Sequence, residues 1–132
     1  MNLRTNGVLI DTAAWIDFAN NRDRAIGDAV QTLIEQSRAV LCGPVVAELL
    51  SGARTEAERQ FISDLVAGTQ YEELARRHWV GAGDLRAGLL ARGHDVPLSD
   101  TVVAALALDG GFELLTTDAH FRRIPGIRFH RV

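Results

Sequence analysis

Short apolar segments alternate with longer amphipathic ones along this chain, and this alternation most constrains its fold. Residues 8–10, 39–42 and 112–116 are rich in apolar side chains and short enough to be buried strands. The segments between them space their apolar residues as helices do, and parallel strands need such crossover helices. The pattern therefore predicts an α/β fold, with a central parallel sheet of about four to five short strands flanked by helices.

The remaining elements follow from periodicity and turn residues. The predicted helices cover residues 13–19, 23–37, 44–50, 55–66, 71–92 and 100–108, and residues 127–132 are predicted as a last strand. No repeat, low-complexity tract or Pro/Ser-rich linker divides the 132 residues. We therefore expect a single domain over residues 1–132.

The composition excludes several kinds of chemistry. All 14 basic residues are arginine, so a Schiff-base lysine and a P-loop lysine are both absent. Cys42 is the only cysteine, which excludes a disulfide within the chain, and the four histidines lack the spacing of zinc sites. The net charge of −3 argues against general coating of nucleic acid, although residues 119–132 carry four arginines and no acid.

Nothing in the sequence indicates export or a membrane. The longest apolar run, residues 102–108, is far shorter than the ~18 residues of a membrane span. Residues 1–7 carry no apolar signal-peptide core. We expect a cytoplasmic protein with no membrane partner.

Four acidic residues fall where this fold would gather them. Asp11 and Asp118 follow predicted strands, Asp100 lies in the first turn of a predicted helix, and Glu48 lies in the helix after the second strand. Taken singly, the aspartates are typical of helix caps and first turns, and Glu48 of a solvent-exposed position. Together they point to one edge of the sheet, because ligands of parallel sheets bind beyond the carboxyl ends of the strands.

Such a cluster has a predictable chemistry. Two carboxylates ~4 Å apart repel by ~4 kcal/mol at an effective dielectric of ~20, so the group takes up protons or recruits a cation. Oxygen ligands suit Mg²⁺ or Mn²⁺, and a magnesium site commonly completes its shell with substrate phosphate. The sequence thus predicts a divalent-metal site that receives a phosphodiester.

The segments around these acids resemble a known family. The segments are VLIDTAAWI at Asp11, PVVAELLSG at Glu48, PLSDTVVAALA at Asp100 and LLTTDAHF at Asp118. In this order they resemble the PIN domain, and more narrowly the VapC toxins of bacterial VapBC toxin–antitoxin pairs, over nearly the whole chain. Ala13-Ala14 and Ala119-His120 depart from the more usual polar residues at their positions.

The resemblance implies a PIN-like fold and a Mg²⁺-dependent endoribonuclease that leaves a 5′-phosphate. It also implies neutralisation by a VapB-type antitoxin and commonly a homodimer. The family's acidic residues carry over onto Asp11, Glu48, Asp100 and Asp118. We expect the three aspartates to hold Mg²⁺, or Mn²⁺, directly or through water, and Glu48 to bind through water or orient the nucleophile.

Other side chains are weaker candidates. Thr12, Ser99 and Thr117 are expected either to steady the carboxylates or simply to cap helices, with Ser99 as the cap of the helix at 100–108. Arg122 and Arg123, with Arg128 and Arg131, are candidates for RNA phosphate contacts or for an ordinary solvated rim. We expect His120 at the surface, and Trp15, Tyr71 and Trp79 in the core rather than stacked on bases.

Two other functions compete with the nuclease. The same fold could bind RNA or a protein partner without cleaving anything, although clustered repulsion brings an inert scaffold no benefit. A receiver-like phosphoacceptor also places acids at strand ends, but it resembles response regulators, whose site uses a lysine that this chain does not have.

Overall fold

A computed structural model describes residues 6–132 of the chain. Residues 1–5, the greater part of the segment expected to have no export signal, lie outside the described residues. Within 6–132, no helix combines the length and the apolar composition needed to cross a bilayer.

The centre of the molecule is a four-stranded sheet. Its strands are β1 (Val8–Ile10), β2 (Ala39–Cys42), β3 (Gln70–Glu72) and β4 (Glu113–Leu115), arranged in the order β3-β2-β1-β4. Every neighbouring pair runs parallel. The predicted fold class is confirmed, and all four strands therefore end at the same edge.

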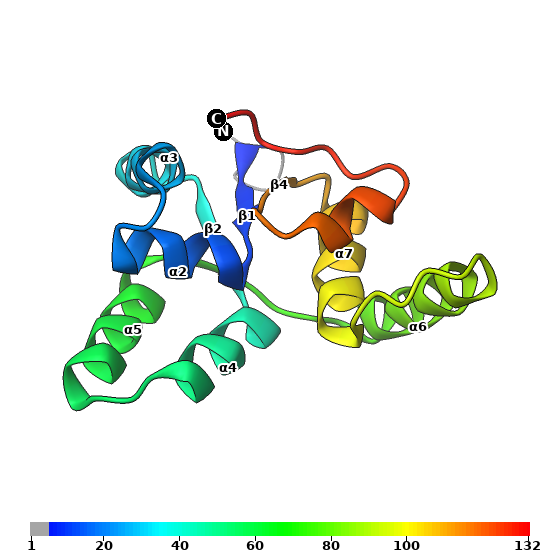
Figure 1. Cartoon of the computed structure of the whole chain (residues 1–132), viewed down its shortest axis with the longest axis horizontal. Coiled ribbons are helices and arrows are strands. Elements are labelled where there is room, and N and C mark those ends of the chain that lie inside the picture. The colour runs from blue at the N-terminus through cyan, green and yellow to red at the C-terminus, as the bar shows by residue number, and fades with distance from the viewer. Residues whose placement is uncertain (1–5) are drawn as a thin grey trace.

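Helices cover the sheet on both sides (Figure 1). They are α2 (Thr12–Asn20), α3 (Arg24–Glu35), α4 (Gly43–Gly52), α5 (Glu56–Gly68), α6 (Arg76–Ala91) and α7 (Leu98–Gly110), followed by the 3-10 helix η1 (Ala119–Arg123). In the view of Figure 1, α2 to α5 lie on one side of β1, and α7 lies on the other with α6 packed outside it.

The sequence prediction is wrong at β3. Residues 71–92 were predicted as one long helix, but residues 70–72 form an edge strand and α6 begins only at Arg76. Polar side chains on either side of Tyr71 give β3 no apolar signature, because an edge strand is solvated along one side. Its register is nevertheless defined, with Tyr71 opposite Leu41.

The predicted strand at 127–132 is also wrong. This segment pairs with β4 only around Leu114, whose N–H donates to Arg128 O while its carbonyl accepts from His130 N–H, both at 2.9 Å. A single bridge, Leu114 to Phe129, results. The residues after His130 are exposed, so burial does not extend the pairing.

Helix α7 is the buried helix of the molecule. Its residues from Thr101 to Ala107 are all buried, because α7 packs between the sheet and α6. Such continuous burial fixes its axis, and therefore the position of Asp100 in its first turn. Ser99 does not cap it: the helix begins at Leu98, with Pro97 as the cap residue.

The turn from α7 into β4 is tightly packed. The last helical residue, Gly110, lies against the ring of Phe112, which is 3% exposed. Gly111 then adopts a left-handed conformation (φ 69°), which glycine reaches without strain. The turn fixes the position of β4 relative to α7, and therefore the position of Asp118 relative to Asp100.

We predict that Gly110→Ala destabilises the protein. A Cβ at this position would lie 2.4 Å from Cε2 of Phe112, so the buried ring would have to shift. Overpacking of this kind costs about 1–3 kcal/mol. Gly88→Ala is the matched control, because no atom of the described residues lies within 4 Å of a Cβ added there in α6, and alanine favours a helix by roughly 0.5–1 kcal/mol. Urea denaturation measures both; a Gly110→Ala variant as stable as the parent would contradict the packing described here.

Candidate functional site

The carboxyl ends of β1 and β4 position the first part of the site. The two strands pair in register, with Ile10 opposite Leu115, and the Asp11 N–H continues the ladder by donating to Leu115 O at 3.1 Å. The Asp11 carboxylate caps α2, where Oδ1 accepts the Ala14 N–H at 3.1 Å. Asp11 is 5% exposed, so the same residue is a helix cap and a buried carboxylate of the site.

One hydroxyl group connects Asp11 to Asp118. Thr116 Oγ1 donates to Asp11 Oδ2 at 2.5 Å and accepts the Asp118 N–H at 2.9 Å. Thr117 was a candidate for such a role or for capping, but it donates to Asp17 at 3.3 Å. Thr116 follows Leu115, so the register that pairs Ile10 with Leu115 brings it level with Asp11.

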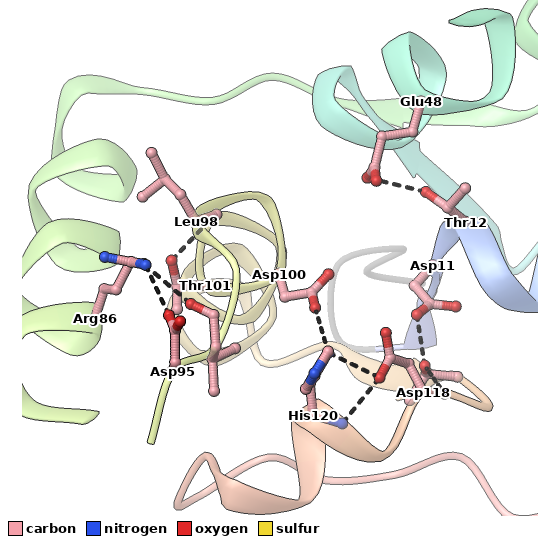
Figure 2. A network of polar contacts seen from close by, with 12 residues as sticks. Asp11, Thr12, Glu48, Arg86, Asp95, Leu98, Asp100, Thr101, Asp118 and His120 are labelled. Carbon is pink, nitrogen blue, oxygen red and sulfur yellow. Dashed lines mark hydrogen bonds and ion pairs between the residues drawn. The ribbon is translucent and has the colours of Figure 1, made fainter. Parts of the chain in front are cut away.

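Asp118 and Asp100 meet around His120. Asp118 caps η1, because its Oδ1 accepts a hydrogen bond from the backbone N–H of His120 at 2.9 Å. His120 Nδ1 lies 3.1 Å from Asp118 Oδ1 and 3.4 Å from Asp100 Oδ2. Figure 2 shows the imidazole between the two carboxylates. His120 was expected as a surface residue; its ring is partly exposed, but its Nδ1 is turned into the site.

Glu48 approaches from the other side of the site (Figure 2). It belongs to α4, and Thr12 Oγ1 donates to its Oε1 at 3.1 Å. Of the two roles that were open for Thr12, the structure therefore shows the contact to a carboxylate. The charge of Glu48 acts on Asp100, whose pKa it helps to raise.

The electrostatics join the four acids into one site. Burial, then the charges of Asp100 and Asp118, raise the pKa of Asp11 to about 6, although the hydrogen bonds from Thr116 and Ala14 lower it. Burial, then the charges of Asp118 and Glu48, raise the pKa of Asp100 to about 6, although His120 lowers it. Both carboxylates are thus held where ionisation costs free energy.

The donor set fits a divalent cation. One ligand atom each from Asp100, Asp118 and His120 lie within 4.8 Å of one another. Among residues 6–132, His120 Nδ1 is buried and has no hydrogen-bond partner, although both carboxylates lie within ion-pair distance. A positive ion between these atoms would satisfy the unpartnered nitrogen and offset the burial and the repulsion that raise the two pKa values.

The arginine candidates separate into two kinds. Arg122 and Arg123 are exposed in η1, where the buried Phe121 separates them from His120. Arg128 instead donates to the Gly111 carbonyl, a contact that braces the α7–β4 turn. Arg131 is exposed near the end of the chain.

The aromatic expectations are partly wrong. Trp15 is 1% exposed and belongs to the core, as expected. Tyr71 and Trp79 are exposed, and they line a hollow with Leu98 beside α7. The helical spacing that placed Tyr71 on a buried face fails because Tyr71 belongs to the edge strand β3.

Comparisons with known proteins agree with this geometry. The PIN domain family model matches residues 8–127. VapC ribonuclease Mb1587 of Mycobacterium bovis and Ribonuclease VapC11 of Mycobacterium tuberculosis are each 30% identical over 124 residues, covering 91% of this chain and 92% of each relative. The DNA-bound VapBC structure from Salmonella typhimurium aligns with a TM-score of 0.81 at 23% identity, over 94% of this chain and 96% of that chain. The chain belongs to the PIN domain family, and within it to the VapC proteins.

We predict that Asp100→Asn stabilises the metal-free protein at neutral pH. The raised pKa means that the folded chain binds more protons than the unfolded chain between pH about 4 and about 6, so this group's contribution to stability falls as pH rises through that range. A shift of the Asp100 pKa from 3.8 to about 6 corresponds to at most about 3 kcal/mol of unfolding free energy. We therefore expect the free energy of unfolding of Asp100→Asn to exceed that of the parent by about 1–3 kcal/mol at pH 7.5.

The measurement is urea unfolding in chelator at several pH values. Asp84→Asn, an exposed acid of α6, is the matched control and should change stability little. The gap between Asp100→Asn and the parent should widen from pH 4 to pH 7. A variant less stable than the parent at pH 7.5 would show that Asp100 does not carry this cost.

Proposed function

We propose that this chain is a metal-dependent endoribonuclease whose site consists of Asp11, Glu48, Asp100 and Asp118. The observation that carries the proposal is the electrostatic coupling of these acids at the carboxyl edge of a parallel sheet, with two pKa values raised to about 6. The 30% identity to two proteins named VapC ribonucleases supports RNA as the substrate.

We propose Mg²⁺ or Mn²⁺ as the cofactor, held by Asp11, Asp100 and Asp118 directly or through water. Such an ion, when bound, polarises the phosphoryl group and eases deprotonation of a water. Thr116 supports this arrangement, because its hydroxyl fixes both Asp11 and the backbone of Asp118. The buried, unpartnered Nδ1 of His120 supports a cation at this place as well.

Glu48 is suited to orient the attacking water. Thr12 holds its Oε1, and we propose that Oε2 accepts a proton from that water. The water oxygen bonds to phosphorus, the bond to the 3′ oxygen breaks, and this oxygen leaves as a hydroxyl after taking up a proton. The products are a 3′-hydroxyl end and a 5′-phosphate end.

Arg122 and Arg123 are the proposed contacts to the RNA backbone. They are exposed and lie two and three residues after His120 in the same short helix, which places their backbone near the site. Guanidinium groups pair with phosphate oxygens in a two-point geometry, and these two arginines supply positive charge next to four acids.

An antitoxin of the VapB type is the proposed protein partner. A groove of about 750 Å³ runs between α2, α4 and α5, lined by apolar side chains such as Ile16, Leu49 and Phe61. Glu48 also lines this groove, so a segment bound there reaches the catalytic site. The similarity to solved VapBC structures supports a partner of this kind. The homodimer, the cytoplasmic location and the single domain over residues 1–132 stay predictions.

We predict that Asp118→Asn abolishes RNA cleavage but leaves the protein folded. The asparagine Oδ1 can still accept the His120 N–H, so the cap of η1 is kept while the negative charge is lost. We expect a loss of at least about 100-fold, because changes to groups that only support ligands already cost ~10–100-fold. End-labelled RNA incubated with protein in Mg²⁺, in Mn²⁺ and in chelator gives the measurement.

Asp84→Asn is again the control and should cleave at the parent rate. Cleavage by the parent should stop in chelator and return with either ion. RNA binding without cleavage in any ion would instead support the non-catalytic binding module, and equal rates for Asp118→Asn and the parent would remove this aspartate from the site.

A further inference from the structure

His120 is the polar residue at the site that the proposed reaction does not yet use. Its Nδ1 is buried without a hydrogen-bond partner, although the side chain as a whole is 44% exposed. Asp118 Oδ1 and Asp100 Oδ2 lie 3.1 and 3.4 Å away, but the geometry at Nδ1 satisfies no hydrogen bond to either. Nδ1 and two carboxylate oxygens therefore face one another at ion-pair distance, without a hydrogen bond of acceptable geometry at Nδ1.

These distances match neighbouring ligands around one ion. In an octahedral shell with bonds of about 2.1 Å, adjacent ligand atoms are about 3.0 Å apart. The observed separations of 3.1 and 3.4 Å are close to this edge length. All three ligand atoms lie within 4.8 Å of one another.

The position of the imidazole is fixed from two directions. The backbone N–H of His120 donates to Asp118 Oδ1 at 2.9 Å, and this hydrogen bond anchors the start of η1. The next residue, Phe121, is fully buried in the core. His120 thus lies on a short helical turn that is held at both sides, and no large rearrangement is needed to present Nδ1 to an ion.

We propose that His120 Nδ1 binds the divalent ion directly, together with Asp100 and Asp118, and that this nitrogen makes the site prefer Mn²⁺ over Mg²⁺. The inference rests on the proposed function, since it concerns the same metal site. Magnesium takes almost exclusively oxygen ligands, whereas first-row transition ions accept imidazole nitrogen readily. From the sequence alone an all-oxygen site is expected, because the spacing of the histidines does not mark His120 as a ligand.

The test uses the full chain, with Mn²⁺ and Mg²⁺ as probes. Pulsed electron paramagnetic resonance of bound Mn²⁺ detects the hyperfine coupling of a directly bound imidazole nitrogen, and calorimetry gives the affinities of both ions. His120→Asn replaces Nδ1 by an amide oxygen at a similar place, and His94→Asn is the matched control away from the site.

We expect nitrogen coupling in the parent and in His94→Asn, and none in His120→Asn. The Mn²⁺ affinity of His120→Asn should fall about tenfold or more, while its Mg²⁺ affinity changes much less. If His120→Asn does not fold, the spectrum of the parent decides alone. Mn²⁺ binding by the parent without nitrogen coupling, or an unchanged Mn²⁺ to Mg²⁺ ratio in His120→Asn, would overturn this inference and leave the proposed function standing. A parent that binds neither ion would overturn both.

Discussion

The burial of Asp11 and the partial burial of Asp100, beside other negative charges, is the constraint on which the site depends. Parallel strands that end at one edge bring Asp11 and Asp118 together, and α7 adds Asp100. Hydrogen bonds from Thr116 and from backbone N–H groups offset part of the cost. Within residues 6–132, no arginine forms an ion pair with any of these acids, and the chain has no lysine. Charge at these acids is therefore offset by protons or by a bound cation.

The fold tolerates the free-energy cost of these charges because the strands and the helix around the site are well buried. Helix α7 is buried from Thr101 to Ala107, and β1 and β2 are fully buried. A scaffold with such burial holds charged groups at positions that they would leave in a flexible loop. A site whose groups are positioned to bind a ligand is expected to lower the free energy of unfolding.

Much of this arrangement could be predicted from the sequence. Asp11 and Asp118 follow apolar strands directly, and the rule that ligands bind beyond the carboxyl ends of parallel strands locates them without coordinates. Three things could not be predicted. The edge strand β3 has polar residues and no apolar signature. The role of Thr116 depends on a strand register that the sequence does not reveal. The orientation of His120 depends on the hydrogen bond that caps η1.

The central claim is that folding holds Asp11 and Asp100 where burial and neighbouring charges oppose their ionisation, and that a bound cation favours it. The most direct measurement is the number of protons released when Mn²⁺ or Mg²⁺ binds at pH 6, from calorimetry in two buffers of different ionisation enthalpy. With the pKa values of Asp11 and Asp100 both raised to about 6, each is about half protonated at this pH, so the account predicts the release of about one proton per chain. Ion binding that releases no proton at pH 6 would contradict it.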